Sequence, residues 1–485
     1  MVKATAYRSI SVAPPLVVDL DGTLIQTDLL HESALRLIKQ RFWIIILFPF
    51  WLLRGRAYLK GKIVEGAHLD YGSLPVHEEL LAWLVSEKRL GRRLVLATAS
   101  DRRLAELTVE RLDLFDAVLG SVGKRNLKGR QKLDAIIHAC GREFDYAGNS
   151  RADQLLWEAS RQAIVVNAGK AVEAAARRSA NVTRVFKPSG SQLRAAVRSL
   201  RLYQWVKNLL IFVPAFTSHK LTDANTLATL SCTVLAFGLC ASGAYVVNDL
   251  FDLEEDRRHR AKRHRPLASG QCSIQIALAL AALCIALGLG IAALIGSGLI
   301  GLLTVYICLT VCYSLYLKKL LLVDVLTLAV LYTMRVIAGH VVTGISFSVW
   351  LSSCVFFLFL SLAFSKRAAE LVAFSSTNLE FVPGRGYAGV DLGIITTAGI
   401  ASGLISSLVL ALYINSDAVR LLYHRPAILW AALPLLLYYI LRIWVIAGRG
   451  KLDADPIIYT VKSRSTYYVA AMVLIVVIAA TTTYF

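Results

Sequence analysis

Three aspartates at the end of an apolar run have a spacing that suits a metal site. Asp249, Asp252 and Asp256 lie in the stretch NDLFDLEEDRRHRAKRHRPLASG, directly after the apolar run LCASGAYVV. Their i, i+3, i+7 spacing places them on one face of a helix. Carboxylates this close repel one another unless a cation joins them, and Mg²⁺ suits clustered carboxylates that also receive phosphate oxygens. The plain alternative is a helix end whose charges are solvated.

Basic residues follow the aspartates and favour the metal site over the solvated helix end. The stretch KRHRPLASG contains Lys262, Arg263 and Arg265, which can hold phosphate oxygens. We therefore expect this part of the chain to bind Mg²⁺ together with a diphosphate.

A second set of candidate residues lies near the N-terminus. An apolar strand ending in D-x-D-G-T, with Asp19 and Asp21, resembles motif I of the haloacid dehalogenase superfamily of phosphatases. The resemblance implies that Asp19 is the nucleophile and Asp21 the general acid and then base. Both would bind Mg²⁺, Asp21 through its backbone carbonyl. Thr98 matches motif II, and Lys132 matches motif III, for which Lys128 is the second choice.

The fourth motif of this set departs from the family pattern. It normally reads G-D-x-x-x-D, whereas Gly148 is followed here by Asn149, and Asp153 is kept. An amide oxygen can still ligate Mg²⁺, but one negative charge is missing, so we expect weaker metal binding. An active phosphatase and a degenerate scaffold therefore both stay open. The resemblance spans about residues 14–170.

Composition shows what kind of chain must position these residues. The 485 residues are 56% hydrophobic with a net charge of +20, and the mean hydropathy is +0.57. That is too apolar for an ordinary soluble enzyme. The bases lie beside apolar runs, so we expect an anionic membrane face or phosphorylated substrates rather than nucleic acid. The eight Cys contain no C-x-x-C and predict neither a disulfide framework nor a zinc site.

Residues 1–195 predict a cytosolic α/β domain with a linker. Short β-rich runs that end at polar residues alternate with helical stretches, which indicates a parallel sheet. The resemblance implies a Rossmann-like haloacid dehalogenase fold with a small helical cap. The N-terminal stretch lacks the long apolar core of a signal peptide, which favours the cytosol. The apolar stretch 42–53 is short for a span. It predicts contact with the membrane or the second domain, with a plain buried core as the alternative.

Residues 196–485 predict an all-α membrane bundle of nine transmembrane helices. The expected spans are about 205–218, 225–247, 273–295, 298–317, 321–342, 347–365, 392–415, 427–447 and 467–484. With the N-terminus inside, the cytosolic loops carry 15 Lys or Arg and the outer loops three. This bias predicts a protein of the cytoplasmic membrane with its C-terminus outside.

The acidic stretch carries a second family resemblance. N-D-x-x-D-x-x-x-D followed by R-P-L-A-S-G resembles the first aspartate-rich motif of the UbiA-type intramembrane prenyltransferase superfamily, which also has nine helices. The resemblance covers about residues 196–485. It implies that Asn248, Asp249, Asp252 and Asp256 hold Mg²⁺ on a diphosphate in a cavity that opens to the cytosol.

Further stretches resemble one branch of that superfamily, the decaprenyl-phosphate phosphoribosyltransferases. They are RLYQWVKN, YSLYLKKLLLVDV with MRVIAGH, SKRAAEL, GRGYAGVD and DADPIIYTVKSR. The branch uses phosphoribosyl pyrophosphate as donor and a polyprenyl phosphate as acceptor. The compact second D-x-x-x-D motif of the aromatic prenyltransferases is not evident. Besides Asn248, Arg263 and Arg265, the candidate substrate-binding residues are Lys207, Asn208, Tyr313, Lys318, Arg335, Lys366, Arg367, Glu370, Arg385, Tyr387 and Asp391.

Arg335 is notable because it lies within a predicted span. A charge at that depth is costly and usually faces a cavity. The alternative is a structural ion pair with a buried acid such as Asp324. Three phosphate groups on two substrates need more cations than a prenyl diphosphate and an aromatic ring, and the basic candidates supply them.

These patterns together predict a Mg²⁺-dependent membrane transferase. It would move 5-phosphoribose to a polyprenyl phosphate, and the first domain would remove the 5-phosphate to leave polyprenyl phosphoryl ribose. One alternative is an aromatic prenyltransferase with a scaffold-like first domain. Another is a transporter or flippase with a cytosolic regulatory domain.

Overall fold

The structure is a computed structural model that describes residues 13–67, 69–122, 126–188, 190–374, 386–452 and 456–481. The chain forms two compact units. The first combines Met1–Ser199 with Asp249–Leu278, and the second combines Leu200–Asn248 with Ala279–Phe485. The acidic stretch therefore packs with the N-terminal part of the chain, although the sequence places it between two membrane spans.

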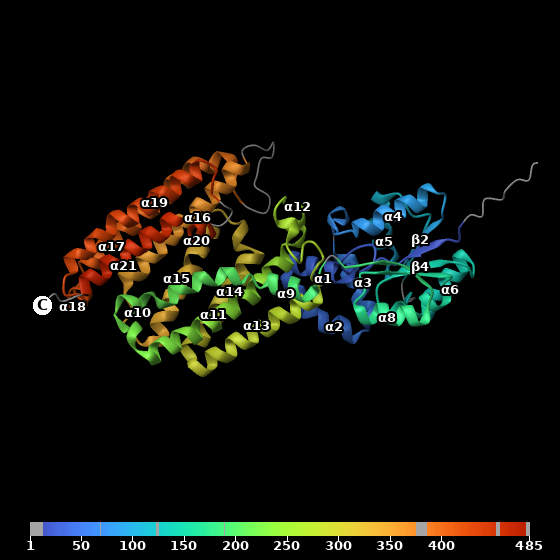
Figure 1. Cartoon of the computed structure of the whole chain (residues 1–485), viewed down its shortest axis with the longest axis horizontal. Helices are drawn as coiled ribbons and strands as arrows, with labels where there is room; N and C mark the ends of the chain where they lie inside the picture. The colour runs from blue at the N-terminus through green and yellow to red at the C-terminus, as the bar shows by residue number, and fades with distance from the viewer. Residues whose placement is uncertain are drawn as a thin grey trace, which may run out of the picture. The chain divides into compact units, whose positions relative to one another are not determined.

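A six-stranded sheet forms the centre of the first unit (Figure 1). All strand pairs are parallel, and the order is β3-β2-β1-β4-β5-β6. The strands are β1 Leu16–Val18, β2 Leu94–Asp101, β3 Ala117–Ser121, β4 Asp145–Gly148, β5 Gln162–Val166 and β6 Val182–Phe186. The predicted parallel α/β domain is confirmed.

Helices cover both faces of this sheet, which explains its short, continuously apolar central strands. Successive side chains of a strand point to opposite faces. Val18 packs in one core with Leu80 and Leu104, while Val17 packs in the other with Trp157. The α-helices that lie wholly within the first unit are α1 Leu29–Gln40, α2 Leu47–Leu53, α3 Arg56–Gly66, α4 Glu78–Arg89, α5 Arg102–Val109, α6 Arg130–Cys140, α7 Gln154–Ala159, α8 Lys170–Ser179, α9 Gln192–Ser199 and α12 Leu253–Arg258.

The helices α1 to α3 lie between the strands β1 and β2 in the sequence. The apolar stretch 42–53 lies within this segment, as a 3-10 helix Phe42–Ile46 followed by α2. Ile44 is buried, but Trp43, Phe50 and Leu53 are exposed. The stretch is therefore not a plain buried core.

Eight helices are long and apolar enough to cross a membrane in the part of the chain described. They are α11 Ala224–Phe251, α13 Ile274–Ile295, α14 Ser297–Leu315, α15 Val323–Thr343, α16 Val349–Phe374, α17 Leu392–Ile414, α19 Ala432–Gly448 and α21 Arg464–Thr481. The second unit also contains the short α-helices α10 Val213–Thr217, α18 Asp417–Leu422 and α20 Pro456–Lys462. The eight long helices correspond to eight of the nine predicted spans.

The first predicted span, 205–218, is not a long α-helix, and this corrects the count of nine transmembrane helices. Its residues form a 3-10 helix, Leu202–Phe212, that runs into α10. The 3-10 helix buries Gln204, Lys207 and Asn208, so polar side chains interrupt its apolar character. Pro214 stands at the start of α10, where it cannot donate a backbone hydrogen bond.

Candidate active sites of the two units

The phosphatase-like residues of the first unit meet at one edge of the sheet. Asp19 directly follows β1, Thr98 lies on β2, and Asn149 directly follows β4. These strands are neighbours in the sheet, with β1 in the middle. The carboxyl ends of parallel strands share one edge, and ligands bind there where the strand order reverses. The strand order therefore brings Asp19, Thr98 and Asn149 to the same edge of the sheet.

A chain of polar contacts connects three of the predicted residues. Lys132 Nζ lies 2.7 Å from Asp19 Oδ1 and 2.8 Å from the hydroxyl of Tyr146. Tyr146 in turn donates to Asp153 Oδ1 at 2.8 Å. Asp153 Oδ2 also accepts from the backbone of Asn149 and Ser150, at 3.1 and 3.0 Å. Lys132 is therefore in contact with Asp19, and Tyr146 takes part in the same network although no motif indicated it.

Asp21 is held by hydrogen bonds on both oxygens. Oδ1 accepts from the backbone N–H of Leu29 at 2.9 Å, and Oδ2 from the hydroxyls of Thr98 and Ser100 at 3.1 and 2.6 Å. Burial, with a further contribution from Asp28, raises the pKa of Asp21. A raised pKa favours the protonated form, which suits a general acid.

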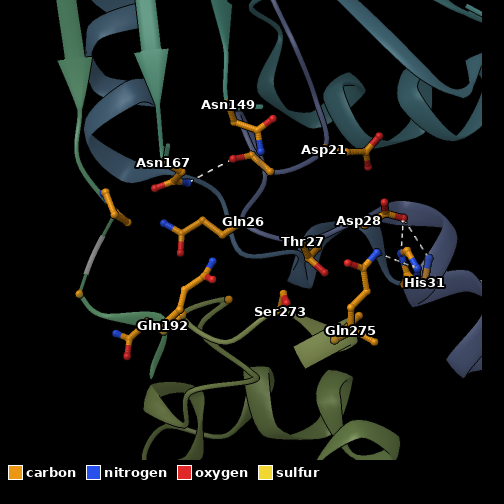
Figure 2. Close-up of a pocket in the computed structure, with 16 residues that line it drawn as sticks. Asp21, Gln26, Thr27, Asp28, His31, Asn149, Asn167, Gln192, Ser273 and Gln275 are labelled. Carbon is orange, nitrogen blue, oxygen red and sulfur yellow. Dashed lines mark hydrogen bonds and ion pairs between the residues drawn. The ribbon is translucent and has the colours of Figure 1, made fainter. Parts of the chain in front are cut away.

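Burial raises the pKa of Asp19 to about 7, against the opposing effect of Lys132. The neighbouring carboxylates Asp153 and Asp21 add to this increase. A cation relieves this repulsion between carboxylates. The carboxylate oxygens at this edge are the type of ligand that Mg²⁺ prefers. Asn149 lines a cavity together with Asp21 (Figure 2).

The aspartates of the acidic stretch do not share one partner. Arg265 Nη1 lies 3.2 Å from Asp249 Oδ1 and 2.5 Å from Asp256 Oδ2. Burial raises the pKa of Asp256 to about 6, with Arg265 acting in the opposite direction. Asp252 instead lies 3.8 Å from the ammonium of Lys39, a residue of α1. The plain alternative of a fully solvated helix end is therefore wrong for Asp249 and Asp256, which are buried.

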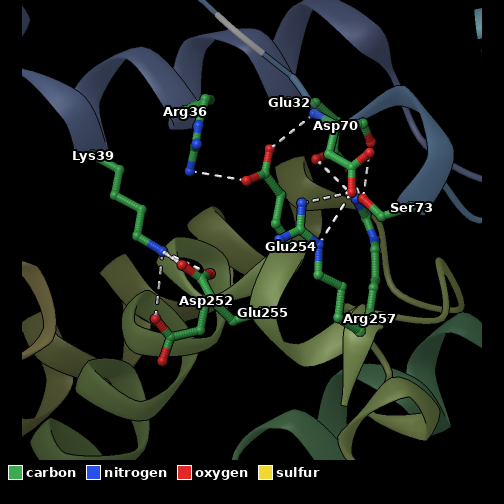
Figure 3. Close-up of polar contacts among 10 residues, drawn as sticks. Glu32, Arg36, Lys39, Asp70, Ser73, Asp252, Glu254, Glu255 and Arg257 are labelled. Atoms are coloured by element: carbon green, nitrogen blue, oxygen red, sulfur yellow. Dashed lines mark hydrogen bonds and ion pairs between the residues drawn. The ribbon is translucent and has the colours of Figure 1, made fainter. Parts of the chain in front are cut away.

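An ion-pair cluster joins α1 to α12 within the first unit (Figure 3). Arg257 contacts Glu32 at 2.6 Å, and both side chains are almost fully buried. Lys39 contacts Glu255 at 2.6 Å, and Arg36 contacts Glu254 at 2.8 Å. Arg258 contacts Asp70 at 2.8 Å. No sequence pattern indicated this cluster, because the paired residues are about two hundred positions apart.

No group of three His, Cys, Asp or Glu side chains is close enough to hold a metal ion as it stands, among the residues described. Asp249 and Asp256 nevertheless share one positive group, Arg265. A divalent cation that displaces Arg265 would meet hard oxygen donors from both, so these two residues fit Mg²⁺. Asp252 faces Lys39 in this structure.

The second unit buries Arg335 among neutral groups. The side chain is 2% exposed. It donates to Asn208 Oδ1 at 3.0 Å, to the carbonyl of Leu331 at 2.6 Å and to the hydroxyl of Tyr306 at 3.2 Å. Among the described residues, no carboxylate lies within ion-pair distance of Arg335. The amide nitrogen of Asn208 is buried without a hydrogen-bond partner in the same part of the chain.

Asp324 pairs with a different arginine, so the alternative that it neutralises Arg335 is wrong. Arg367 Nε lies 2.6 Å from Asp324 Oδ2. Arg367 also pairs with Glu370, and Tyr387 donates to Asp324. Arg367 is thus a buried arginine with two carboxylate partners, in contrast to Arg335.

The other predicted residues are distributed over both units. Tyr313 accepts from Arg367 at 3.2 Å, and Asn248 accepts from Ser314 at 2.8 Å. Asp391 accepts from the backbone of Ala388 at 2.8 Å. Lys318 is buried and Lys366 is partly buried on α16, whereas Arg263 is exposed. Arg385 lies outside the described residues. The roles of all these residues stay predictions.

This chain is similar to several known proteins, among them the following three. An uncharacterized protein of Sinorhizobium fredii, y4nM, is 34% identical over 94% of this chain and 89% of its own length. The decaprenyl-phosphate phosphoribosyltransferase of Corynebacterium glutamicum is 32% identical over 37% of this chain and 56% of its own. A solved UbiA homologue from Archaeoglobus fulgidus, bound to GPP and Mg²⁺, is 18% identical with a TM-score of 0.46, covering 59% of this chain and 99% of that chain.

A family model described as the UbiA prenyltransferase family matches residues 210–462, which is slightly more than half of the chain. That range contains α11, the acidic stretch and most of the long apolar helices. The chain is therefore a multi-pass membrane transferase that belongs to the UbiA prenyltransferase family.

Proposed function

We propose that this protein transfers 5-phosphoribose from phosphoribosyl pyrophosphate to a polyprenyl phosphate, and that its N-terminal domain then removes the 5-phosphate. The observation that carries the first part is Arg335, a buried cation without a carboxylate partner among the described residues. Burying a charge is costly unless an opposite charge accompanies it. An anionic substrate group supplies that charge. The similarity to a decaprenyl-phosphate phosphoribosyltransferase supports the choice of substrates.

The transfer exchanges one bond at C1 of the ribose. The bond from C1 to the pyrophosphate oxygen breaks through an oxocarbenium-like state, and an oxygen of the lipid phosphate bonds to C1. This oxygen is already anionic, so the reaction needs no strong base. Arg335, Lys207 and the free amide nitrogen of Asn208 would position phosphate groups by charge-assisted hydrogen bonds. Mg²⁺ held by Asp249 and Asp256 would neutralise charge on the departing pyrophosphate.

The hydrolysis that follows uses the strand-edge residues of the first unit. Asp19 attacks phosphorus and forms an aspartyl phosphate, while Asp21 protonates the departing sugar oxygen. Asp21 then takes a proton from water, which attacks phosphorus and releases inorganic phosphate. Lys132, 2.7 Å from Asp19, favours the ionised nucleophile. The contacts from Thr98 and Lys132 to the two aspartates support this assignment.

Because both proposed activities lie in one chain, the phosphatase can act directly on the lipid that the transferase has made. The lipid product of the transferase is the substrate of the phosphatase, and a tethered enzyme meets it at high effective concentration. Trp43, Phe50 and Leu53 are exposed apolar side chains of the first unit. Such side chains bind the interface of a lipid bilayer, where this substrate resides.

The two chain segments that make up the first unit support nine membrane crossings, although the first predicted span is not one long α-helix. The chain leaves this unit after Ser199 and returns to it at Asp249. Because α11 crosses the membrane once, 205–218 must cross as well for the chain to return to the same side. At a rise of about 2.0 Å per residue in a 3-10 helix and 1.5 Å in an α-helix, Leu202–Thr217 extends about 30 Å, the thickness of the hydrocarbon core.

Donor choice tests the transferase proposal. Purified protein with Mg²⁺ and polyprenyl phosphate is given either labelled phosphoribosyl pyrophosphate or labelled prenyl diphosphate with an aromatic acceptor. We expect label in lipid only from phosphoribosyl pyrophosphate, and at least about a hundredfold less from an Asp249→Asn variant. Product from the prenyl diphosphate alone would identify an aromatic prenyltransferase instead. Movement of intact lipid with no bond broken would indicate a transporter.

A further inference from the structure

The cavity in front of the phosphatase-like residues is built from two distant parts of the chain. It has a volume of about 240 Å³ and lies within the first unit. Asp21 and Asn149 lie on one side of it, while Gln192, Ser273 and Gln275 lie on the opposite side (Figure 2). The last two residues belong to the segment 270–275, which starts at the final glycine of RPLASG and ends in the first turn of α13.

Close contacts hold the segment 270–275 against the N-terminal domain. Gly270 has a φ of +75°, and a Cβ atom added there would lie 2.6 Å from Cβ and 2.7 Å from the carbonyl oxygen of Gln26. Only glycine permits this approach. Gln275 Nε2 lies 3.2 Å from His31 Nε2, and His31 pairs with Asp28 at 2.8 Å. The segment is therefore a fixed wall of the cavity.

The lining of the cavity indicates the class of compound that it accepts. Among its described lining residues none is Lys or Arg, and the amides and hydroxyls of Gln26, Thr27, Gln192, Ser273 and Gln275 predominate. Neutral groups that both donate and accept hydrogen bonds suit sugar hydroxyls. Lys132, 2.7 Å from Asp19 Oδ1 at the strand edge, is a cation that can receive a phosphate.

We propose that this cavity is a binding site for the sugar of a phosphorylated sugar, and that the segment 270–275 of the transferase sequence forms its specificity wall. The phosphate lies at Asp19 and Asp21, and the sugar hydroxyls bond to Gln275, Ser273 and Gln192. The proposal rests on the phosphatase activity proposed above and adds the residues that recognise the sugar of its substrate. It also makes the acidic stretch and the phosphatase substrate site parts of one folded unit.

The test compares a sugar phosphate with an aryl phosphate. Full-length protein with Mg²⁺ is assayed for phosphate release from ribose 5-phosphate and from phenyl phosphate, which has no hydroxyls to recognise. Gln275→Ala and Gln192→Ala should each raise KM for ribose 5-phosphate by about three- to tenfold, the effect of losing one hydrogen bond. Both should leave phenyl phosphate hydrolysis unchanged. Gln40→Ala, an exposed glutamine of α1 away from the cavity, is the matched control.

Equal losses on both substrates, or no loss on either, would overturn the specificity wall. Calorimetric titration with ribose 5-phosphate separates this proposal from the phosphatase activity. Binding by the wild type that weakens in Gln275→Ala, without phosphate release, would refute the phosphatase and keep the sugar site. A wild type that neither hydrolyses nor binds ribose 5-phosphate would refute the sugar site.

Discussion

Two buried arginines of the helical unit differ in what neutralises them. Among the described residues, Arg335 contacts neutral acceptors and the rings of Phe237, Tyr306 and Tyr332. Its Cζ lies 4.9, 5.3 and 5.5 Å from the three ring centroids. Arg367 has the carboxylates of Asp324 and Glu370. The aromatic faces attract a cation but do not replace a counter-charge. We infer that Arg367 has a structural role and that Arg335 is kept for an anionic substrate.

Replacing each arginine with methionine should therefore change a different property, substrate binding for Arg335 and stability for Arg367. Arg335→Met should raise KM for a phosphate-bearing substrate by about tenfold or more, without lowering the thermal midpoint, because a buried charge without a carboxylate partner is removed. Arg367→Met should destabilise the protein by about 3–5 kcal/mol, because two carboxylates lose their partner. Thermal unfolding in detergent and initial rates measure the two effects. Arg335→Met with a lowered midpoint and an unchanged KM would show that Arg335 is structural.

At the scale of elements, α1 and α12 connect the two proposed sites. The helix α1 starts close to the phosphatase-like residues, since the N–H of Leu29 donates to Asp21. The helix α12 carries Asp256 and is preceded by Asp252. The pair of Glu32 and Arg257 joins them, with both side chains buried. A buried pair is costly to break from one side, because the remaining charge is left without a partner.

Glu32→Gln should consequently lower the stability of the first unit by about 3 kcal/mol and slow the transferase reaction as well. The charge exchange of Glu32→Arg with Arg257→Glu should restore part of both. The matched control is Glu65→Gln, because Glu65 pairs with Lys62 at an exposed site, where such pairs contribute at most about 1 kcal/mol. Limited proteolysis and initial transferase rates report the effects. A slowed phosphatase with a normal transferase would show that α12 does not depend on α1.

Patterns local to the sequence predicted most elements and the strand-edge site. Apolar strands that end at Asp19, Thr98 and Asn149 converge because parallel strands share an edge. Eight spans followed from apolar runs alone. The first span was missed as a 3-10 helix because its buried polar residues reflect tertiary contacts, such as Asn208 with Arg335. The pairing of Glu32 with Arg257 joins residues 225 positions apart, which periodicity and spacing cannot show.

For the whole molecule, the acidic stretch and the N-terminal domain belong to one unit, which constrains the membrane topology. The chain between Ser199 and Asp249 leaves and returns, so it makes an even number of crossings. Seven further long apolar helices follow Asp249 in the described ranges of the chain. The two ends of the chain should therefore lie on opposite sides of the membrane. The excess of Lys and Arg in alternate loops predicts that the N-terminal side is the cytosol.

Reporter fusions check this topology. Alkaline phosphatase, active only outside the cytosol, should be active when fused after Phe485 and inactive when fused ahead of Met1. A fluorescent protein that matures only in the cytosol should give the inverse pattern. Equal behaviour of the two fusions would mean that 205–218 does not cross, and it would contradict nine crossings.

The most direct test of the whole account is a doubly labelled donor. Phosphoribosyl pyrophosphate carrying ¹⁴C in the ribose and ³²P in the 5-phosphate is incubated with the protein, Mg²⁺ and polyprenyl phosphate. The account predicts that ¹⁴C enters the lipid while ³²P is released as inorganic phosphate. With Asp19→Asn, both labels should stay together in the lipid. Lipid without ¹⁴C would contradict the phosphoribosyl transfer, and wild-type lipid that retains both labels would contradict the phosphatase.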